Sequence, residues 1–332
     1  MTIVKAIFGN FFTFLMAVFL TVFPYKGIEL SKINTSKEDC RMVAELISDT
    51  HVESKELARF GFIKEGFRHL SNADITIDAV VNAGDITNYA DEDSLAKYYE
   101  VIKEYSPAVV INAAGNHDIG HAGDRDVTDI SREEAKANFI RYNNEYLGIE
   151  AEDNYYSYEV NGYKFIVIGD ECVDGGHWDD LDILEAQMAF LDSELAEATA
   201  DGKPAFVVCH WPVDGMNGQE VIWPGSGIDL SKNDVKSVME KYDNVFYISG
   251  HMHTGIKSDA VDKYFKLASV EQCNGVTYVS LPTYGLVNMF GIPSSGTGMQ
   301  LEVYDDSVVF RPRNFITNFW YTNSAYTIDL VK

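Results

Sequence analysis

Hydrophobic positions form two kinds of pattern between residues 41 and 258. Short unbroken apolar runs are typical of buried strands. They alternate with longer segments in which apolar residues recur with the period of an amphipathic helix. The pattern predicts strands at residues 42–48, 77–81, 108–112, 204–209 and 245–249, and helices at 54–70, 93–105, 182–200 and 233–242. Such an alternation of strands and helices indicates that the strands are parallel.

Turn and cap signals add further elements. Ser131 and Glu134 form a capping box, which predicts a helix that begins there and ends at Gly148. Asn161 and Gly162 separate two alternating runs and predict a β-hairpin. After residue 258 the pattern changes to short strands only, at 264–268, 276–280, 299–304, 308–311 and 325–330. We therefore predict a mixed α/β fold with more than one sheet.

The N-terminal part of the chain has a different character. Residues 6–25 contain no charged side chain, and Lys5 and Lys26 flank them. A helix of about 20 such residues is about 30 Å long, the thickness of a bilayer core. Residues 1–26 are therefore predicted to be a signal peptide or an N-terminal anchor, and the lack of a small-x-small cleavage site favours the anchor. A buried core helix is the alternative interpretation.

This segment sets the expected domain organisation and location. We expect a polar linker at residues 27–40, with a short strand at 27–30, and one domain, with a β-rich C-terminal portion, at residues 41–332. The protein is then membrane-anchored through its N-terminal segment or secreted, with the domain on the extracytoplasmic side. Nothing in the sequence indicates the oligomeric state.

Charge and cysteine content exclude some classes of function. Asp and Glu total 51 against 26 Lys and Arg, which gives a net charge of −25. Such a surface repels polyanions, and we expect no long nucleic acid as a partner. The four cysteines show no CxxC spacing, so neither a zinc knuckle nor a redox pair is indicated.

Five of the predicted strands share a second property, because each runs into Asp, Asn or His side chains. The carboxyl ends of parallel strands meet at one rim of a sheet, so we expect these side chains to converge. The candidates are Asp49, His51, Asp85, Asn116, His210, His251 and His253. Gly84, Gly115 and Gly250 precede several of them and are expected to permit sharp backbone turns.

These seven side chains are two carboxylates, one amide and four imidazoles. Imidazoles and carboxylates together suit divalent transition-metal ions such as Zn, Mn and Fe. Seven ligands are too many for one four-coordinate ion but suit two ions that share a carboxylate. Two metals about 3.5–4 Å apart are a standard arrangement for phosphoryl transfer, in which a bridging hydroxide attacks phosphorus. The pattern therefore indicates hydrolysis of a phosphate ester in a small substrate.

Taken together, the motifs resemble the calcineurin-like metallophosphoesterase superfamily across residues 42–254. The matching order is Asp49-x-His51, Gly84-Asp85, Gly115-Asn116-His117-Asp118, His210 and Gly250-His251-x-His253. The resemblance implies a four-layer α/β/β/α sandwich with two mixed sheets and the metal site at the carboxyl ends of strands. It also implies that Asp49, His51, Asp85 and His253 hold the first metal, and that Asp85, Asn116, His210 and His251 hold the second.

His117 is not needed as a ligand in that scheme. The resemblance gives it contact with the phosphate and protonation of the leaving oxygen, and an imidazole beside a metal-bound phosphate is suited to this. Protein phosphatases of the superfamily support this histidine with an aspartate where this chain has Asn88, which argues against that branch. Asp118 is the other candidate support. Purple acid phosphatases carry a tyrosine where this chain has His51, so the small-substrate and cyclic-nucleotide-type phosphodiesterases are the closer likeness.

Two loops rich in Gly and Trp follow the metal strands and are candidates for the substrate rim. Trp211, His177 and Arg125 are the residues expected there, and Trp223 lies in the same loop as Trp211. Aromatic side chains at such a rim can stack a base or ring. Tryptophans also anchor long loops to the protein body, and a solvated loop charge is the alternative for Arg125.

Two questions of function stay open at this level. A catalytically silent, metal-stabilised interaction module at the membrane is the alternative to an enzyme. Within the enzyme interpretation, the sequence does not distinguish a phosphomonoesterase from a phosphodiesterase.

Overall fold

The computed structural model describes residues 28–30, 39–73, 75–119, 130–171, 181, 183–232, 234–256, 267–286, 288, 295–321 and 325–332. The apolar segment predicted at residues 6–25 lies outside these ranges. Within them, no helix combines the length and the apolar character needed to cross a bilayer.

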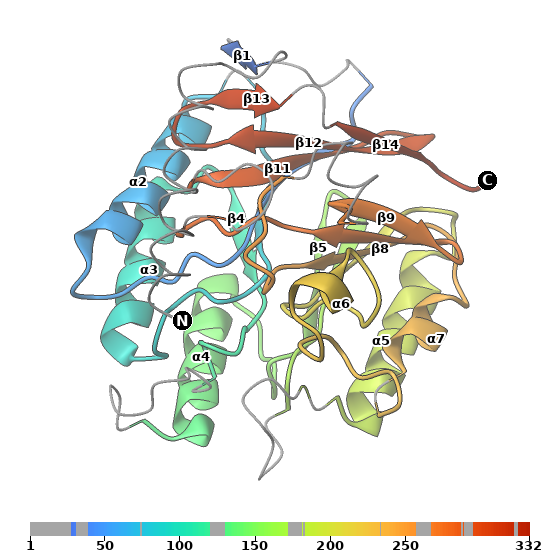
Figure 1. Ribbon diagram of the computed structural model, residues 1–332, viewed down its shortest axis with the longest axis horizontal. Helices are drawn as coiled ribbons and strands as arrows, with labels where there is room; N and C mark the ends of the chain where they lie inside the picture. Colours follow the sequence, from blue (N-terminus) through green and yellow to red (C-terminus); the bar gives the residue numbers. More distant parts are fainter. Residues whose placement is uncertain are drawn as a thin grey trace, which may run out of the picture.

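Two mixed β-sheets form the centre of the fold (Figure 1). The first has eight strands in the order β1 (Ile28–Leu30), β13 (Phe319–Tyr321), β12 (Ser307–Asn314), β11 (Thr297–Val303), β2 (Met42–Ile47), β3 (Ala79–Asn82) and β4 (Val109–Asn112), with β14 (Tyr326–Asp329) beside β12. The second has six, in the order β5 (Tyr156–Val160), β6 (Tyr163–Val167), β7 (Ala205–Val208), β8 (Val245–Ser249), β10 (Val276–Ser280) and β9 (Val270–Cys273).

Among the described strands, those that lead into the candidate ligands are paired in parallel, and so are β6 and β10. In the first sheet β2, β3 and β4 are parallel, and in the second β6, β7, β8 and β10 are parallel. The remaining pairs are antiparallel. The predicted α/β class with two mixed sheets is confirmed.

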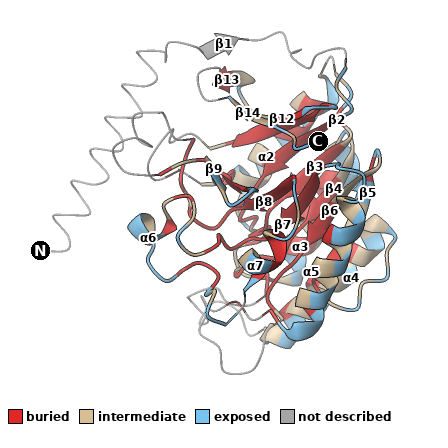
Figure 2. Cartoon of the chain, turned by 90° about the vertical axis from the view of Figure 1, so that its right-hand side faces the viewer, coloured by how far each residue is buried: buried red, intermediate tan, exposed pale blue. Residues whose placement is uncertain are grey.

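Helices cover the outer faces of both sheets and complete four layers. In Figure 1, α2 (Leu57–Ser71), α3 (Glu92–Tyr105) and α4 (Arg132–Leu147) lie beside the first sheet, at the left. On the right, α5 (Glu185–Ala198) and α7 (Val235–Met239) lie beside the second, and the short α6 (Gln219–Ile222) lies in a loop between them and the centre. Figure 2 shows the buried strands in the middle, with exposed residues on the outer helices.

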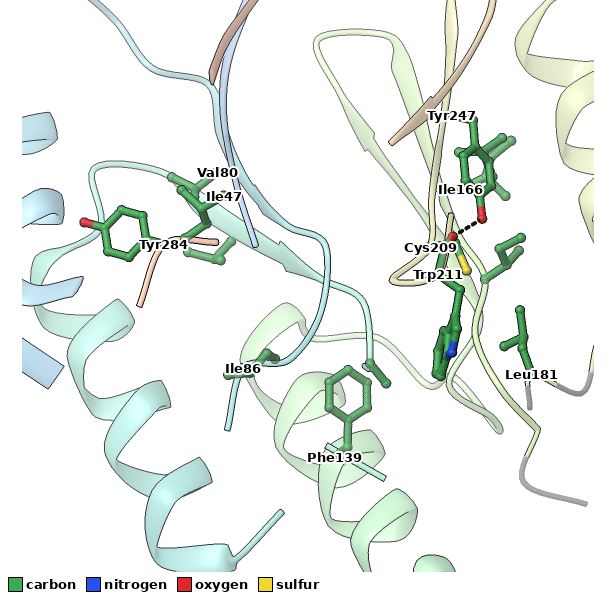
Figure 3. Close-up of a cluster of buried hydrophobic side chains, with 14 of the residues drawn as sticks. Ile47, Val80, Ile86, Phe139, Ile166, Leu181, Cys209, Trp211, Tyr247 and Tyr284 are labelled. Carbon is green, nitrogen blue, oxygen red and sulfur yellow. Dashed lines mark hydrogen bonds between the residues drawn. The ribbon is translucent and has the colours of Figure 1, made fainter. Parts of the chain in front are cut away.

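The core follows from the alternation of side chains along the strands. Leu46, Val81 and Phe206 belong to the hydrophobic cluster between the sheets. Their neighbours Ile47 and Val80 belong to a second cluster, which the helices cover (Figure 3). Parallel strands buried on both faces need apolar residues at consecutive positions, and the unbroken apolar runs in the sequence have this cause.

Local signals of the sequence have the expected structures. Ser131 accepts a hydrogen bond from the backbone N–H of Glu134 and begins α4, and Gly148 ends it in the left-handed region at φ 68°. Asn161 and Gly162 form the hairpin turn with φ of 52° and 78°. The predicted helix at 233–242 is shorter, from Val235 to Met239.

Two strands were not predicted. β9 is an edge strand with polar residues at its centre, and β13 has three residues, so neither gives a clear alternation. Most of the strand predicted at 264–268 lies outside the described residues, and its last two residues form no strand.

Candidate metal centre

The loops that follow the parallel strands are joined by backbone hydrogen bonds at one edge of the sandwich. Asp49 N–H donates to the carbonyl of Gly84, and His51 N–H donates to that of Asp85, both at 2.9 Å. Gly250 N–H donates to the carbonyl of His210 at 3.0 Å. Between the sheets, His210 Nδ1 lies 2.8 Å from the carbonyl oxygen of Ala83. The ends of strands from both sheets therefore meet, as the sequence predicted for this rim.

The backbone turns occur at the polar residues themselves. Asp49, His51, Asp85, His251 and His253 all have φ between 46° and 68°, in the left-handed region. This conformation costs energy for residues other than glycine and clusters at functional sites. It turns each side chain out of the strand direction and toward the rim.

The expected role of the glycines needs correction at two positions. Gly84 has φ of 96° and does form a turn, but Gly115 and Gly250 are absent from the left-handed region. A Cβ atom at Gly115 would collide with Asp85 Oδ1, and one at Gly250 would collide with Ser48 Oγ and lie 2.7 Å from Asp49 Oδ2. These two glycines make room for the carboxylates.

One group of four side chains brings its ligand atoms within 4.8 Å of one another: Asp49, His51, Asp85 and His253. His51 Nε2 lies 3.1 Å from His253 Nε2 and 3.6 Å from Asp85 Oδ2. His253 Nε2 lies 3.1 Å from Asp49 Oδ1. These are the residues that the family resemblance assigns to the first metal.

A second group continues from Asp85 on its other side. His210 Nε2 lies 3.2 Å from Asp85 Oδ2 and 3.2 Å from His251 Nδ1. His251 Nδ1 in turn lies 3.1 Å from Asn116 Oδ1. The residues expected around the second metal are therefore linked in one chain of contacts, and Asp85 belongs to both groups.

Burial and charge divide the four imidazoles into two kinds. Burial lowers the pKa of His51 to about 3, and burial together with the charge of His210 lowers that of His251 to about 3. Burial also opposes the protonation of His210, but Asp85 raises its pKa to about 9. The pKa of His253 is raised by Asp49 against the same effect. In each facing pair, one imidazole thus has a raised pKa and the other a lowered one.

The charges of the histidines also act on the two carboxylates, Asp49 and Asp85. Burial opposes the ionisation of Asp49, yet His253 and His210 lower its pKa to about 2. Burial likewise opposes the ionisation of Asp85, and His210 and His117 hold its pKa well below the usual range. Both side chains are therefore carboxylates at neutral pH and can bind cations.

The donor set fits divalent metal ions. Asp49 Oδ1 is buried, and the only side-chain nitrogens that face it among the described residues are the ring nitrogens of His253 and His51. His210 Nδ1 lies 2.8 Å from the carbonyl of Ala83, which fixes its N–H there and leaves Nε2 for a ligand. A cluster in which carboxylate oxygens and imidazole lone pairs face one another is completed by cations.

His117 lies beside the first group. Its backbone N–H donates to Asp85 Oδ1 at 2.9 Å, and its Nε2 lies 4.0 Å from Asp85 Oδ2. Its Nδ1 lies 2.8 Å from the carbonyl oxygen of Asn88. The side chain is 25% exposed, so His117 faces the open side of the site.

The expected supports of His117 have different contacts. Asn88 supports it through its backbone carbonyl, while its side chain contacts His51. Asp118 accepts hydrogen bonds from the backbone of Ile86, Thr87 and Gly115. Asp118 therefore joins the loops after β3 and β4, and burial with the charge of Asp85 raises its pKa to about 6.

One residue expected at the substrate rim, Trp211, does not lie there. Trp211 is fully buried in the core beside Cys209 and Tyr247, whose hydroxyl donates to the carbonyl of Trp211 at 2.6 Å (Figure 3). It cannot line an exposed rim, because the loop turns its ring inward. Trp223 is 37% exposed, and its ring stacks on His251 at a centroid distance of 5.8 Å. His177 and Arg125 lie outside the described residues.

The sequence analysis gave no supporting role to the loop after β10. After β10, Thr283 Oγ1 and the N–H of Gly285 both donate to the carbonyl of Asp49. A Cβ atom at Gly285 would lie 2.1 Å from the carbonyl oxygen of Thr50. The only signal in the sequence was the glycine itself, which does not identify a partner.

Comparisons with known proteins agree with this geometry. A family model described as calcineurin-like phosphoesterase matches residues 46–255. A dimetal phosphatase from Danio rerio is 13% identical with a TM-score of 0.55, over 88% of this chain and 100% of its own. A purple acid phosphatase from yellow lupin seeds is 14% identical with a TM-score of 0.55, over 87% of this chain and 53% of its own.

A third solved structure is GAP50, described as the anchor in the inner membrane complex of Plasmodium. It is 13% identical with a TM-score of 0.53, over 88% of this chain and 90% of its own. At these identities the likeness shows the fold alone, and no curated protein matches the chain. The matched family segment covers well over half of the sequence and contains every candidate ligand. The chain therefore belongs to the calcineurin-like phosphoesterase family and is a metal-dependent phosphoesterase.

Proposed function

We propose that the protein hydrolyses phosphate monoesters or diesters of small substrates with two divalent transition-metal ions. Asp49, His51, Asp85 and His253 would hold the first, and Asp85, Asn116, His210 and His251 the second. When bound, such a pair supplies Lewis-acid charge and lowers the pKa of water for attack on phosphorus. The observation that carries the proposal is the convergence of all seven side chains around Asp85.

His117 would protonate the leaving oxygen of the ester. The carbonyl of Asn88 accepts from its Nδ1, at 2.8 Å, so Nε2 is the atom that faces Asp85 and the open side. A proton held on Nε2 is within reach of a substrate bound there. General acid catalysis of this kind contributes about 10²–10⁴-fold to a rate.

The substrate class follows from charge and access. The net charge of −25 disfavours long polyanions, whereas a local pair of cations attracts a single phosphate group. We place the protein in the small-substrate or cyclic-nucleotide-type phosphodiesterase branch, because Asn88 and His51 depart from the motifs of the protein phosphatases and purple acid phosphatases.

Location is part of the same proposal. The uncharged residues 6–25 support an anchor or a signal peptide that places the domain outside the cytoplasm. Carbonate extraction of membranes from expressing cells tests this. The anchor predicts that the full chain stays in the pellet, whereas a cleaved signal peptide predicts a soluble, shortened chain.

Hydrolysis of p-nitrophenyl phosphate and of its bis ester with added Mn²⁺ tests the activity. We expect wild-type protein to release p-nitrophenol and Asp85→Asn to be inactive, with about two metal equivalents per wild-type chain. Asp305→Asn is the matched control, because this exposed carboxylate pairs only with Arg41 among the described ion pairs. Metal binding without hydrolysis of either ester would favour the silent interaction module. The ratio of the two rates assigns monoesterase or diesterase activity.

A further inference from the structure

A closed ring of hydrogen bonds surrounds the first candidate ligand, His51. His51 Nδ1 lies 3.2 Å from Asn88 Oδ1, and Asn88 Nδ2 donates to Glu53 Oε1 at 2.6 Å. Arg59, in the first turn of α2, donates from Nη1 to the same Glu53 oxygen at 2.8 Å. The same Nη1 also donates to the backbone carbonyl of His51 at 3.0 Å. The ring thus holds both the side chain and the main chain of His51.

The chemistry of the ring members fixes the direction of every hydrogen bond. A carboxylate only accepts hydrogen bonds, so Glu53 requires the NH₂ group of Asn88 to face it. The amide oxygen of Asn88 then faces His51 and accepts from Nδ1–H. In a neutral imidazole the lone pair is consequently on Nε2, the atom that lies among His253, Asp85 and Asp49.

We propose that Glu53, Asn88 and Arg59 are positioning residues that hold His51 in the tautomer and orientation needed to bind the first metal. The inference rests on the proposed role of His51 as a metal ligand. His51 has φ of 46°, a conformation that a non-glycine residue keeps only when its surroundings hold it. The bond from Arg59 to the carbonyl of His51 acts at this strained residue.

Asn88 connects the ring to the acid side of the site. Its backbone N–H donates to the carbonyl of Val52 at 3.1 Å, and its own carbonyl accepts from His117 Nδ1 at 2.8 Å. One residue therefore orients a metal ligand through its side chain and His117 through its main chain. A side-chain substitution at this position separates the two roles, because the carbonyl remains.

Three variants test the ring, with the first-metal dissociation constant measured by competition with a chromophoric chelator. Hydrogen-bond partners of metal ligands contribute about 10- to 100-fold to metal affinity. We expect Asn88→Ala and Glu53→Ala to weaken Mn²⁺ binding within this range, and saturating Mn²⁺ to restore turnover to within about threefold. Glu53→Gln should stay within about threefold of wild type, because its amide oxygen can accept from both Asn88 and Arg59.

Glu56→Ala is the matched control. Glu56 pairs with Arg59 through Nε, at 3.2 Å, and Nε takes part in none of the hydrogen bonds of the ring. The backbone N–H of Glu56 donates to the carbonyl of Glu53 at 3.0 Å, a bond that the substitution keeps. It should leave the dissociation constant within about threefold of wild type, as for the conservative variant. Equal weakening by Glu56→Ala and Glu53→Ala, or unchanged binding in Asn88→Ala, would overturn the proposal.

A readout without metal separates this inference from the proposed function. The ¹⁵N shifts of the His51 ring, assigned by comparison with His51→Gln, report which nitrogen carries the proton. We expect Nδ1–H in wild type and a mixture of tautomers in Asn88→Ala, with thermal unfolding confirming that each variant folds. If wild type binds no metal, the proposed function fails. The tautomer of His51 still shows whether the ring of hydrogen bonds orients this side chain. An unchanged tautomer in Asn88→Ala overturns the ring.

Discussion

Two buried polar clusters, which contain Glu45 and Asp49 respectively, differ in how their carboxylates are paired. Glu45, in the middle of β2, pairs with Arg313 of β12 at 2.8 Å, and both side chains are fully buried. Arg311 pairs with Glu302 on the same sheet at 2.9 Å. Each carboxylate in this cluster has an arginine from the protein itself.

Asp49, two residues beyond the end of β2, has no such partner. Among the described residues, no lysine or arginine forms an ion pair with Asp49 or Asp85, whose charged neighbours are histidines. Carboxylates and imidazoles face one another across about 3 Å instead. A buried cluster whose charges are paired within the protein serves the fold, whereas one made of carboxylates and imidazoles alone suits cations. We call the first, with Glu45 and Arg313, the closed cluster and the second, with Asp49 and Asp85, the open cluster.

The largest difference is expected on removing one carboxylate from the open cluster. Asp49→Asn should lower kcat/KM for p-nitrophenyl phosphate by more than about 10³-fold, a loss of about 4 kcal/mol, because the first metal loses a charged ligand. It should also remove the share of the stabilisation by Mn²⁺ that the first metal supplies, about 2.7 kcal/mol at 100 times the dissociation constant of that metal. Urea unfolding with and without Mn²⁺ measures this.

Glu45→Gln is the control for that comparison. It changes a buried carboxylate on the same strand, four positions earlier, and should keep the full stabilisation by Mn²⁺. Full Mn²⁺ stabilisation of Asp49→Asn would contradict the assignment of Asp49 to the first metal.

Substitutions in the closed cluster should lower the free energy of unfolding and leave metal binding unchanged. Removing one member of a buried pair leaves an uncompensated charge and typically costs 3–5 kcal/mol. We expect a loss of about this size in the free energy of unfolding of Arg313→Met, measured in urea, with the metal content of the folded protein unchanged. Arg311→Met should cost less, because the Arg311 side chain is 18% exposed. Equal losses would argue against burial as the cause.

The same comparison shows what could be predicted from the sequence. An apolar run followed by Asp49-x-His51 gives both the strand and its polar end, and the parallel arrangement then brings the ends together. The pairing of Glu45 with Arg313 gives no such signal, because the two residues are 268 positions apart and neither belongs to a motif.

Backbone and side-chain conformations that depend on tertiary contacts could not be predicted from the sequence either. The left-handed turns at Asp49 and His51 depend on hydrogen bonds to the loop after β3, and nothing in the two residue types requires them. Trp211 and Trp223 lie in one loop without periodicity, so the sequence could not tell which ring is buried. The contact of the Asn88 carbonyl with His117 involves the main chain, which a residue identity does not report.

The two carboxylates of the comparison should titrate in separate pH windows. Burial raises the pKa of Glu45 to about 7 although Arg313 opposes the shift, whereas Asp49 has its pKa lowered to about 2. Between about pH 4.5 and 7 the folded protein keeps a proton on Glu45 that the unfolded chain releases. The contribution of Glu45 to the free energy of unfolding therefore falls as the pH rises through this window. That of Asp49 is lost only when the pH falls below its unfolded value.

Glu45→Gln removes the first of these contributions. The difference in unfolding free energy between Glu45→Gln and wild type should grow by up to about 3 kcal/mol from pH 4.5 to 7 and be constant above that window. Urea unfolding in the presence of a chelator, repeated across this range, measures it. A difference that does not vary with pH would mean that Glu45 titrates normally in the folded protein.

The smallest effect concerns the tryptophan of each cluster. Trp320 lies under Arg313 at 4.4 Å and is buried, whereas Trp223 stacks on His251 and is 37% exposed. The Trp320 ring is enclosed in the protein, whereas part of the Trp223 ring is exposed and can contact a ligand. Aromatic stacking contributes about 0.5–1.5 kcal/mol, so Trp223→Ala should raise KM for an aryl phosphate by about 2- to 12-fold. The KM for an alkyl phosphate should change less, because an alkyl group cannot stack on the ring. Equal increases for both substrates would mean that Trp223 acts only by packing against His251.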